Sequence, residues 1–170
     1  MSLQAPTKGR WNQAQPWVSL LLRLAIAAVA LWAAIPKLVD IAQAQRATAA
    51  YQIFPVWASD LIGVAVPVVE LAIAICLLAG FLTRYAAAVF GLMMVAFVVG
   101  IASAWARGLN IDCGCFGGGG ELPADQAAKY GLEIARDVGL AAAATVLMIW
   151  PSSPASIDKV LRLDPVTKGA

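Results

Sequence analysis

Residues 61–105 read LIGVAVPVVELAIAICLLAGFLTRYAAAVFGLMMVAFVVGIASAW, and this stretch decides the fold. It holds two apolar runs, 61–82 and 85–105, each close to the ~20 residues that a helix needs to cross a bilayer. Only Thr83 and Arg84 lie between them. Because so short a turn sends the chain straight back, the two runs are predicted to form an antiparallel hairpin of membrane-spanning helices.

Two further apolar runs flank this hairpin. The run 17–35 ends at Pro36 and Lys37, and no convincing small-residue cleavage site follows it, so it is predicted to be a retained span rather than a signal peptide. The run 130–150 ends before Pro151 and reaches the length of a span only if its outer turns carry charged residues. Those charged residues are Glu133, Arg136 and Asp137.

The four runs predict an all-α membrane protein, a four-transmembrane-helix antiparallel bundle over residues 17–150. Residues 1–16 are predicted to be a flexible N-terminal tail, and residues 151–170 a C-terminal tail. The mixed segment 37–60 is expected to form a short interfacial helix followed by an aromatic anchor at the headgroups. A helical stretch over 157–163 is expected to lie at the surface.

The composition supports a membrane location and excludes several classes of function. Hydrophobic residues make up 61% of the 170 residues and charged residues 13%, whereas soluble domains carry about 25% charged residues. The net charge of +2, without any basic cluster, argues against nucleic-acid binding. The chain contains no histidine, which excludes histidine general bases and most zinc sites.

The distribution of lysine and arginine predicts the orientation. One side of the membrane would hold Lys8, Arg10, Arg84, Lys159, Arg162 and Lys168. The other side would hold Lys37, Arg46, Arg107 and Lys129. Both termini are therefore predicted to be cytoplasmic. Arg23, near the cytoplasmic end of the first span, is expected to snorkel to the headgroups.

The loop over 106–129, on the outer side, carries the most informative motif: Asp112-Cys113-Gly114-Cys115-Phe116-Gly117. Two cysteines separated by one residue can close only a strained disulfide ring, and strain makes a disulfide easier to exchange. The oxidising side of the membrane allows such a bond to persist. Arg107 is a candidate to stabilise a thiolate and lower the pKa of one cysteine. The loop is therefore interpreted as a redox site.

Two other interpretations of the cysteine pair remain open. A purely structural disulfide is disfavoured because so small a loop removes little entropy from the unfolded chain. A half-site for Cu(I) is the second alternative, since thiolates select soft metals. The remaining cysteine, Cys76, is interpreted as a small buried apolar residue.

Glu70 is the next strongest signal, because a carboxylate inside a span is costly and normally faces the bundle interior or is paired. Arg136 is its predicted partner. The pair is either a structural lock between two helices or part of proton or quinone chemistry. Pro67, one turn earlier, is expected to kink the helix and widen a cavity beside the acid.

Several of these motifs occur together in one known family. They are Pro67-x-x-Glu70, Gly80 and Arg84 at the turn, Arg107-Gly108 before Cys113-Gly114-Cys115-Phe116-Gly117, Lys37 after the first span, and Arg136-Asp137 opening the fourth. Over residues 17–150 the chain resembles the MauE branch of the DoxX-like integral membrane proteins. The cysteine motif is the most specific element of this resemblance.

The resemblance implies a four-helix membrane bundle linked to methylamine utilisation and to disulfide formation in a client protein. The four-helix layout is also similar to that of DsbB and vitamin K epoxide reductase, which pass electrons from thiols to quinone. Those proteins use two cysteine pairs, whereas this chain has one, which weighs against a quinone step.

Three hypotheses follow for the function. The first is a thiol–disulfide oxidoreductase whose Cys113–Cys115 pair reacts with an extracytoplasmic thioredoxin-fold partner or client, with quinone as a candidate acceptor. The supporting residues would be Lys37, Pro67, Glu70, Arg107 and Arg136. The second is a non-enzymatic membrane assembly or scaffold subunit of a redox complex. The third is a Cu(I)-handling protein.

Overall fold

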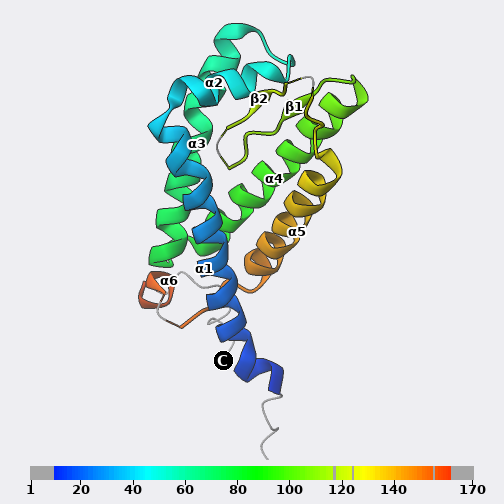
Figure 1. The fold of residues 1–170 in the computed structure, drawn as a ribbon. Helices are drawn as coiled ribbons and strands as arrows, with labels where there is room; N and C mark the ends of the chain where they lie inside the picture. Colours follow the sequence, from blue (N-terminus) through cyan, green and yellow to red (C-terminus); the bar gives the residue numbers. More distant parts are fainter. Residues whose placement is uncertain (1–9, 117, 124, 155, 162–170) are drawn as a thin grey trace, which may run out of the picture.

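The computed structural model describes residues 10–116, 118–123, 125–154 and 156–161, and this part of the chain is almost wholly helical (Figure 1). Its elements, in chain order, are α1 (Arg10–Val39), α2 (Ile41–Ala50), α3 (Val56–Ala79), α4 (Thr83–Ala106), β1 (Ile111–Asp112), β2 (Gly120–Glu121), α5 (Tyr130–Ile149) and α6 (Ile157–Val160). The helical membrane fold that the sequence predicts is confirmed in this coarse sense.

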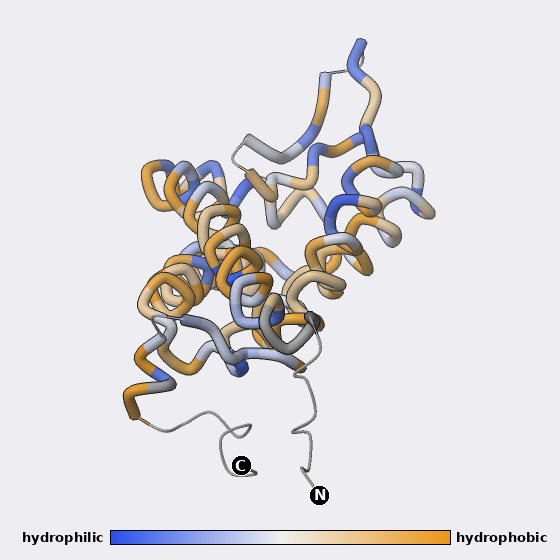
Figure 2. The backbone as a smooth tube through the Cα atoms, turned by 90° about the horizontal axis from the view of Figure 1, so that it is seen from below, coloured by the Kyte–Doolittle hydropathy of each residue, from blue (hydrophilic) through white to orange (hydrophobic). Residues whose placement is uncertain are grey.

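Three of the described helices are long and apolar enough to cross a membrane: α1 from Ala14 onward, α3 and α4. They match the predicted spans at 17–35, 61–82 and 85–105. Large apolar side chains on these helices point outward, as Trp32 and Leu92 do, each at least 70% exposed. The tube coloured by hydropathy shows how strongly hydrophobic residues dominate the helices (Figure 2). Such a surface is suited to lipid rather than water.

The first helix is longer at both ends than predicted. Residues 10–16, expected in a flexible tail, belong to α1, while residues 1–9 lie outside the described part. The predicted stop at Pro36 is also wrong, because a proline removes a single backbone donor and α1 continues to Val39. The turn comes at Asp40, whose Oδ1 accepts a hydrogen bond from the Gln43 backbone N–H and caps α2.

The helices pack as two close pairs, α1 with α3 and α4 with α5. Their shared core is rich in small residues, including Ala27, Ala30, Ala74 and Ala87, which are all fully buried. Small side chains allow helix backbones to approach closely, which is the usual packing mode within a membrane. Phe90 and Leu77 fill the remaining space.

At one end of the bundle, α2 lies beside a short ladder formed by β1 and β2 (Figure 1). The two strands pair antiparallel, with Ile111 opposite Glu121. This ladder closes the loop that carries the cysteines and brings the loop against α2. The predicted short helix between the first two spans corresponds to α2.

The opposite end of the bundle is closed by the C-terminal segment. Asp158 of α6 is buried, and its two carboxylate oxygens accept hydrogen bonds from the backbone N–H groups of Leu82 (2.7 Å) and Thr83 (2.8 Å). The segment lies at the surface as expected, with Ile157, Val160 and Leu161 exposed. Asp158 alone turns inward, because the first N–H groups of α4 need acceptors and its carboxylate supplies them. Residues 162 and 163, the end of the expected helix, lie outside the described part.

Arg23 belongs to this closed end and does not snorkel. Its side chain is buried, and Nη1 donates a hydrogen bond to Ser153 Oγ at 2.9 Å. The docked C-terminal segment supplies the polar partner that would otherwise have to be found at the headgroups.

Candidate redox site

The cysteine loop is held in place by hydrogen bonds from several elements. Asp112 Oδ1 accepts a bond from the Gly114 N–H at 2.9 Å, which forms a tight turn. Tyr51, at the end of α2, donates its hydroxyl to the Cys113 carbonyl at 3.1 Å. Gln43 donates to the Gly119 carbonyl at 2.6 Å. The loop is therefore anchored to α2 on both sides of the cysteines.

Glycines allow the loop to lie directly on α2. Gly114 and Gly119 have φ values of +67° and +86°, which other residues rarely adopt. A Cβ atom on Gly119 would lie 2.5 Å from the Gly114 Cα and 2.8 Å from the Ala47 Cβ. The glycine richness thus reflects close backbone packing. Gly117, the last residue of the motif, lies outside the described part.

The three cysteines are free thiols with different surroundings. Cys115 is buried, at 6% exposed, whereas Cys113 is half-buried. The Cys115 backbone N–H donates a hydrogen bond to Cys113 Sγ at 3.4 Å. Cys76 packs against the core of the bundle, as expected for a small apolar residue.

The two sulfur atoms face opposite charges from α5. Arg136 Nη2 donates to Cys113 Sγ at 3.5 Å, and its Nε donates to Asp137 Oδ1 at 2.9 Å. Cys115 Sγ lies 4.0 Å from Asp137 Oδ2. A guanidinium therefore stands beside one thiol and a carboxylate beside the other, which makes the pair electrostatically unequal.

Phe116, the residue after the cysteine pair, positions this guanidinium. The Arg136 guanidinium carbon lies 4.6 Å from the centre of the Phe116 ring, a cation–π contact. On its other side the ring lies 5.9 Å, between centroids, from Trp32 of α1. The Phe116 side chain thus links the first helix to the arginine beside Cys113.

The unequal surroundings separate the two thiols chemically. The hydrogen bond from the Cys115 thiol, assisted by the bond from Arg136, lowers the pKa of Cys113. The same thiol–thiol bond, together with burial, raises the pKa of Cys115. Burial also raises the pKa of Tyr51, which keeps this hydroxyl a donor to the loop. Cys113 is thus the more acidic thiol of the pair, and Cys115 the less acidic one.

Arg107 does not serve the role predicted for it. Its guanidinium is exposed and donates hydrogen bonds to the backbone carbonyls of Tyr51 and Gln52. It supports the connection between α2 and α3, while Arg136 contacts the thiol. Sequence proximity to the cysteines was misleading here because the loop turns away from the end of α4.

The predicted Glu70–Arg136 ion pair is also wrong. Lys37 Nζ lies 2.6 Å from Glu70 Oε1, and both side chains are buried. Because α1 continues past Pro36, Lys37 lies on a helical turn that packs against α3 and reaches the carboxylate. Arg136 is committed to Asp137 and Cys113 instead.

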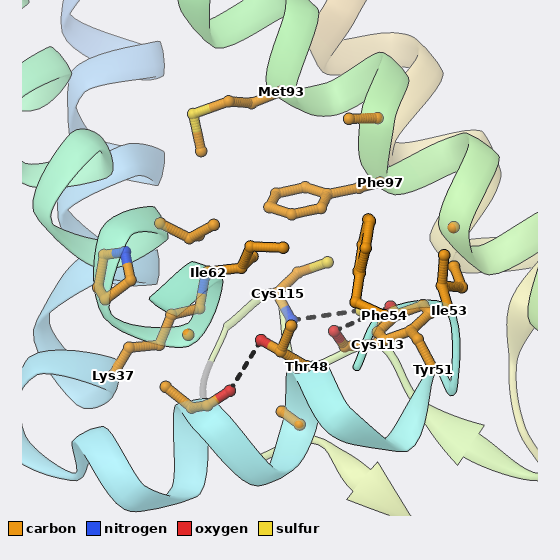
Figure 3. Close-up of a pocket in the computed structure, with 18 of the residues that line it drawn as sticks. Lys37, Thr48, Tyr51, Ile53, Phe54, Ile62, Met93, Phe97, Cys113 and Cys115 are labelled. Atoms are coloured by element: carbon orange, nitrogen blue, oxygen red, sulfur yellow. Dashed lines mark hydrogen bonds between the residues drawn. The ribbon is translucent and has the colours of Figure 1, made fainter. Parts of the chain in front are cut away.

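A cavity of about 550 Å³ lies between the cysteine loop and α2, α3 and α4. Figure 3 shows Met93 and Phe97 of α4 on one side and Thr48 of α2 with the two cysteines on the other. Its walls are almost wholly apolar, and Lys37 contributes the charged group. Pro67 is among the lining residues, while the Glu70 carboxylate is reached through Lys37.

Among the described residues, Asp112, Cys113 and Glu133 form a cluster that could hold a metal ion, with ligand atoms within 4.8 Å of one another. Two carboxylates and one thiolate do not form the all-sulfur set that favours Cu(I). The thiol in this cluster is also the one that Arg136 contacts. The donor set therefore fits the copper hypothesis poorly.

Sequence reasoning missed Asp137 and Tyr51 as parts of the site. Asp137 carries the same signal as Glu70, an acidic residue in an apolar helix, but the sequence marks it only as one of the charged residues in the outer turns of the fourth run. Its side chain is in fact only 1% exposed. Tyr51 belongs to the segment 37–60, for which an aromatic anchor at the headgroups is predicted, and no local pattern indicates its bond to the loop.

Two comparisons with known proteins give a match. The family model described as "Methylamine utilisation protein MauE" matches residues 15–151. The methylamine utilization protein MauE of Paracoccus denitrificans is 32% identical over 110 residues, which cover 64% of this chain and 59% of that protein. The chain thus spans less than two thirds of the length of this curated relative. No solved structure matches the chain.

Proposed function

The chain belongs to the MauE family of membrane proteins, and on this premise we propose that its Cys113–Cys115 pair exchanges thiols and disulfides with a client protein. The observation that carries the proposal is the unequal pair, with Arg136 at 3.5 Å from one sulfur and Asp137 at 4.0 Å from the other. A stabilised thiolate beside a protonated thiol is typical of exchange-active dithiols. A structural disulfide needs no such arrangement.

The exchange begins at Cys113, which is the more exposed sulfur. A client thiolate attacks Cys113 Sγ of the oxidised pair, the Cys113–Cys115 bond breaks, and Cys115 leaves and takes up a proton. The second client thiol then attacks the mixed disulfide, and Cys113 leaves as the thiolate that Arg136 stabilises. Once the Cys113 thiolate has taken up a proton from solvent, the client has lost two electrons and two protons, and the pair has gained them.

We place the cysteine loop on the extracytoplasmic side, with four spans and both termini in the cytoplasm. The 20-residue α5 is about 30 Å long at ~1.5 Å per residue, which suffices to cross the hydrocarbon core. Its charged side chains lie in the first two turns, beside the cysteine loop. A thioredoxin-fold partner on that side is the proposed reactant, and the name of the Paracoccus relative points to methylamine utilisation as the process.

The test is to trap the mixed disulfide. Full-length Cys115→Ser protein is incubated with a thioredoxin-fold protein that keeps only its attacking cysteine, activated as a mixed disulfide with thionitrobenzoate. A stable covalent adduct through Cys113 is expected, because neither protein then has a resolving thiol. The Cys113→Ser variant should form little adduct, and Cys76→Ser should behave as the wild type. Exchange that persists in a Cys113→Ser, Cys115→Ser double variant would contradict the proposal and favour a scaffold role.

A further inference from the structure

We infer that the cavity beside the cysteine pair binds a lipophilic quinone, which accepts the electron pair of the Cys113–Cys115 dithiol. This inference rests on the proposed thiol–disulfide function and names the oxidant that regenerates the disulfide. It comes from three properties of the cavity: its apolar walls, its one cation and its two sulfur atoms.

The walls of the cavity suit a ligand that dissolves in lipid. Its volume, about 550 Å³, lies within the range of about 300–1,000 Å³ typical of small-molecule sites. Ile62, Val66, Met93 and Phe97 are among its lining residues. They belong to α3 and α4, which are candidate membrane spans, so a molecule in the bilayer lies next to the cavity.

Lys37 requires that this ligand carry a hydrogen-bond acceptor. An ammonium group has three N–H donors, and the structure gives one hydrogen bond from Lys37 Nζ, to Glu70 Oε1 at 2.6 Å. Lys37 Nζ also lies 5.8 Å from the centroid of the Phe97 ring. Glu70 Oε2 is buried and has no hydrogen-bond partner among the described residues. A ring carbonyl in the cavity would accept a bond from Lys37 in an otherwise apolar setting.

The two sulfurs supply the redox chemistry. Cys113 and Cys115 both line the same cavity, so electrons can pass directly to a bound ring without a second cysteine pair. The reaction forms one S–S bond between the two cysteines. The two electrons and two thiol protons that are lost reduce the quinone to a quinol. In this scheme the single pair reacts in turn with the client and with the quinone in the cavity. A second cysteine pair is therefore not needed for the quinone step.

Oxidation of the reduced protein by ubiquinone-1 tests this assignment. Full-length protein in lipid nanodiscs is reduced, freed of reductant, and mixed anaerobically with ubiquinone-1 while quinol absorbance and free thiols are followed. The expected result is one quinol formed for each Cys113–Cys115 pair oxidised. No quinol from wild-type protein that still exchanges thiols with its thioredoxin-fold reactant would overturn the inference and leave the proposed function intact.

Two sets of variants connect the reaction to the cavity. Val66→Trp fills the cavity and is expected to slow quinol formation at least about tenfold, the effect of losing one good contact. Val68 lies on the same helix and is 52% exposed, so Val68→Trp should have no effect on quinol formation. The double variant Lys37→Gln, Glu70→Gln leaves no isolated buried charge and should raise the quinone concentration for half-maximal rate about tenfold, the loss of one charge-assisted bond. Lys37→Arg should keep this concentration near the wild-type value. Equal rates in Val66→Trp and wild type would show that the cavity is not the site.

Discussion

The two ends of the helical bundle both bury charged residues, but they use them differently. At the C-terminal end, both carboxylate oxygens of Asp158 accept backbone hydrogen bonds from the start of α4. At the cysteine end, Lys37 lines an apolar cavity, and Glu70 Oε2 lacks a partner among the described residues. The C-terminal end also holds buried oxygens without a partner among the described residues, Thr83 Oγ1 and Ser152 Oγ. What distinguishes the cysteine end is therefore the apolar cavity beside its charged pair and its thiols, a setting typical of ligand or catalytic sites.

Within the cysteine end, some residues position the loop and others contact the sulfur atoms. Tyr51 and Gln43 hold the loop through hydrogen bonds to its backbone carbonyls, and Gly114 and Gly119 let it lie directly on α2. Arg136 and Asp137 instead face sulfur atoms, whose protonation changes during the proposed reaction. Variants at the C-terminal end should therefore change the stability alone, whereas variants of the residues that face the sulfur atoms should change the thiol chemistry.

The largest effect is expected for Lys37→Met, which leaves Glu70 buried without its cation. Breaking one partner of a buried ion pair costs about 3–5 kcal/mol. Unfolding of the detergent-solubilised protein by denaturant should show this loss. The double variant Lys37→Met, Glu70→Leu should recover most of it, because no isolated charge then remains. A loss below about 1 kcal/mol in the single variant would mean that the pair is hydrated rather than buried.

A smaller loss is expected for Asp158→Ala at the opposite end. The variant removes the acceptors of two N–H groups at the start of α4, which should cost about 2 kcal/mol of unfolding free energy. Thiol alkylation rates should stay at the wild-type value, since the site lies at the other end of the bundle. Altered alkylation of Cys113 in this variant would show that the two ends of the bundle are not independent.

Gly119→Ala tests how closely the loop must pack on α2. Its Cβ would collide with Gly114 and Ala47, and its φ of +86° disfavours alanine, so we expect a loss of about 1–2 kcal/mol and faster alkylation of Cys115. Gly118→Ala is the matched control. Gly118 has a φ of +73° but nothing within 4 Å of its Cβ position, so Cys115 should stay protected there. Equal exposure of Cys115 in both variants would show that strain alone moves the loop.

The smallest energetic effect concerns the pKa of Cys113. Arg136→Gln removes a donor to the thiolate and should raise this pKa by about one unit, or about 1.4 kcal/mol. Because only the thiolate reacts, the pH midpoint of Cys113 alkylation should lie below the ordinary value of about 8.5 in the wild type and move upward in the variant. Arg107→Gln is the control and should leave the midpoint unchanged. A midpoint that moves in Arg107→Gln and not in Arg136→Gln would show that Arg107 stabilises the Cys113 thiolate.

The sequence predicts the helices well because their signal is local and strong. The apolar runs at 61–82 and 85–105 need no partner to be recognised, and α3 and α4 follow them closely. The cysteine motif is likewise recognised as a cysteine pair in a polar loop, and Glu70 as a carboxylate within an apolar run. The end of α1 was misjudged because a proline within a helix costs one bond, which packing can offset.

The pairing of charges could not be predicted in the same way. Which cation meets Glu70 depends on how far α1 continues and how it rotates against α3, and no local pattern encodes that rotation. The same holds for Arg136, which reaches Cys113 across 23 residues of sequence. Residue type identifies the charged groups that need partners, and only the packed helices decide which partners they find.

The most direct measurement is disulfide mapping of the full-length protein after mild oxidation. Peptide mass analysis should find one bond, between Cys113 and Cys115, and unmodified Cys76. Reduction by a thioredoxin-fold protein should remove that bond at a rate that falls in Arg136→Gln. Two thiols that stay free under the oxidant, or that pair with other molecules instead of each other, would contradict the account.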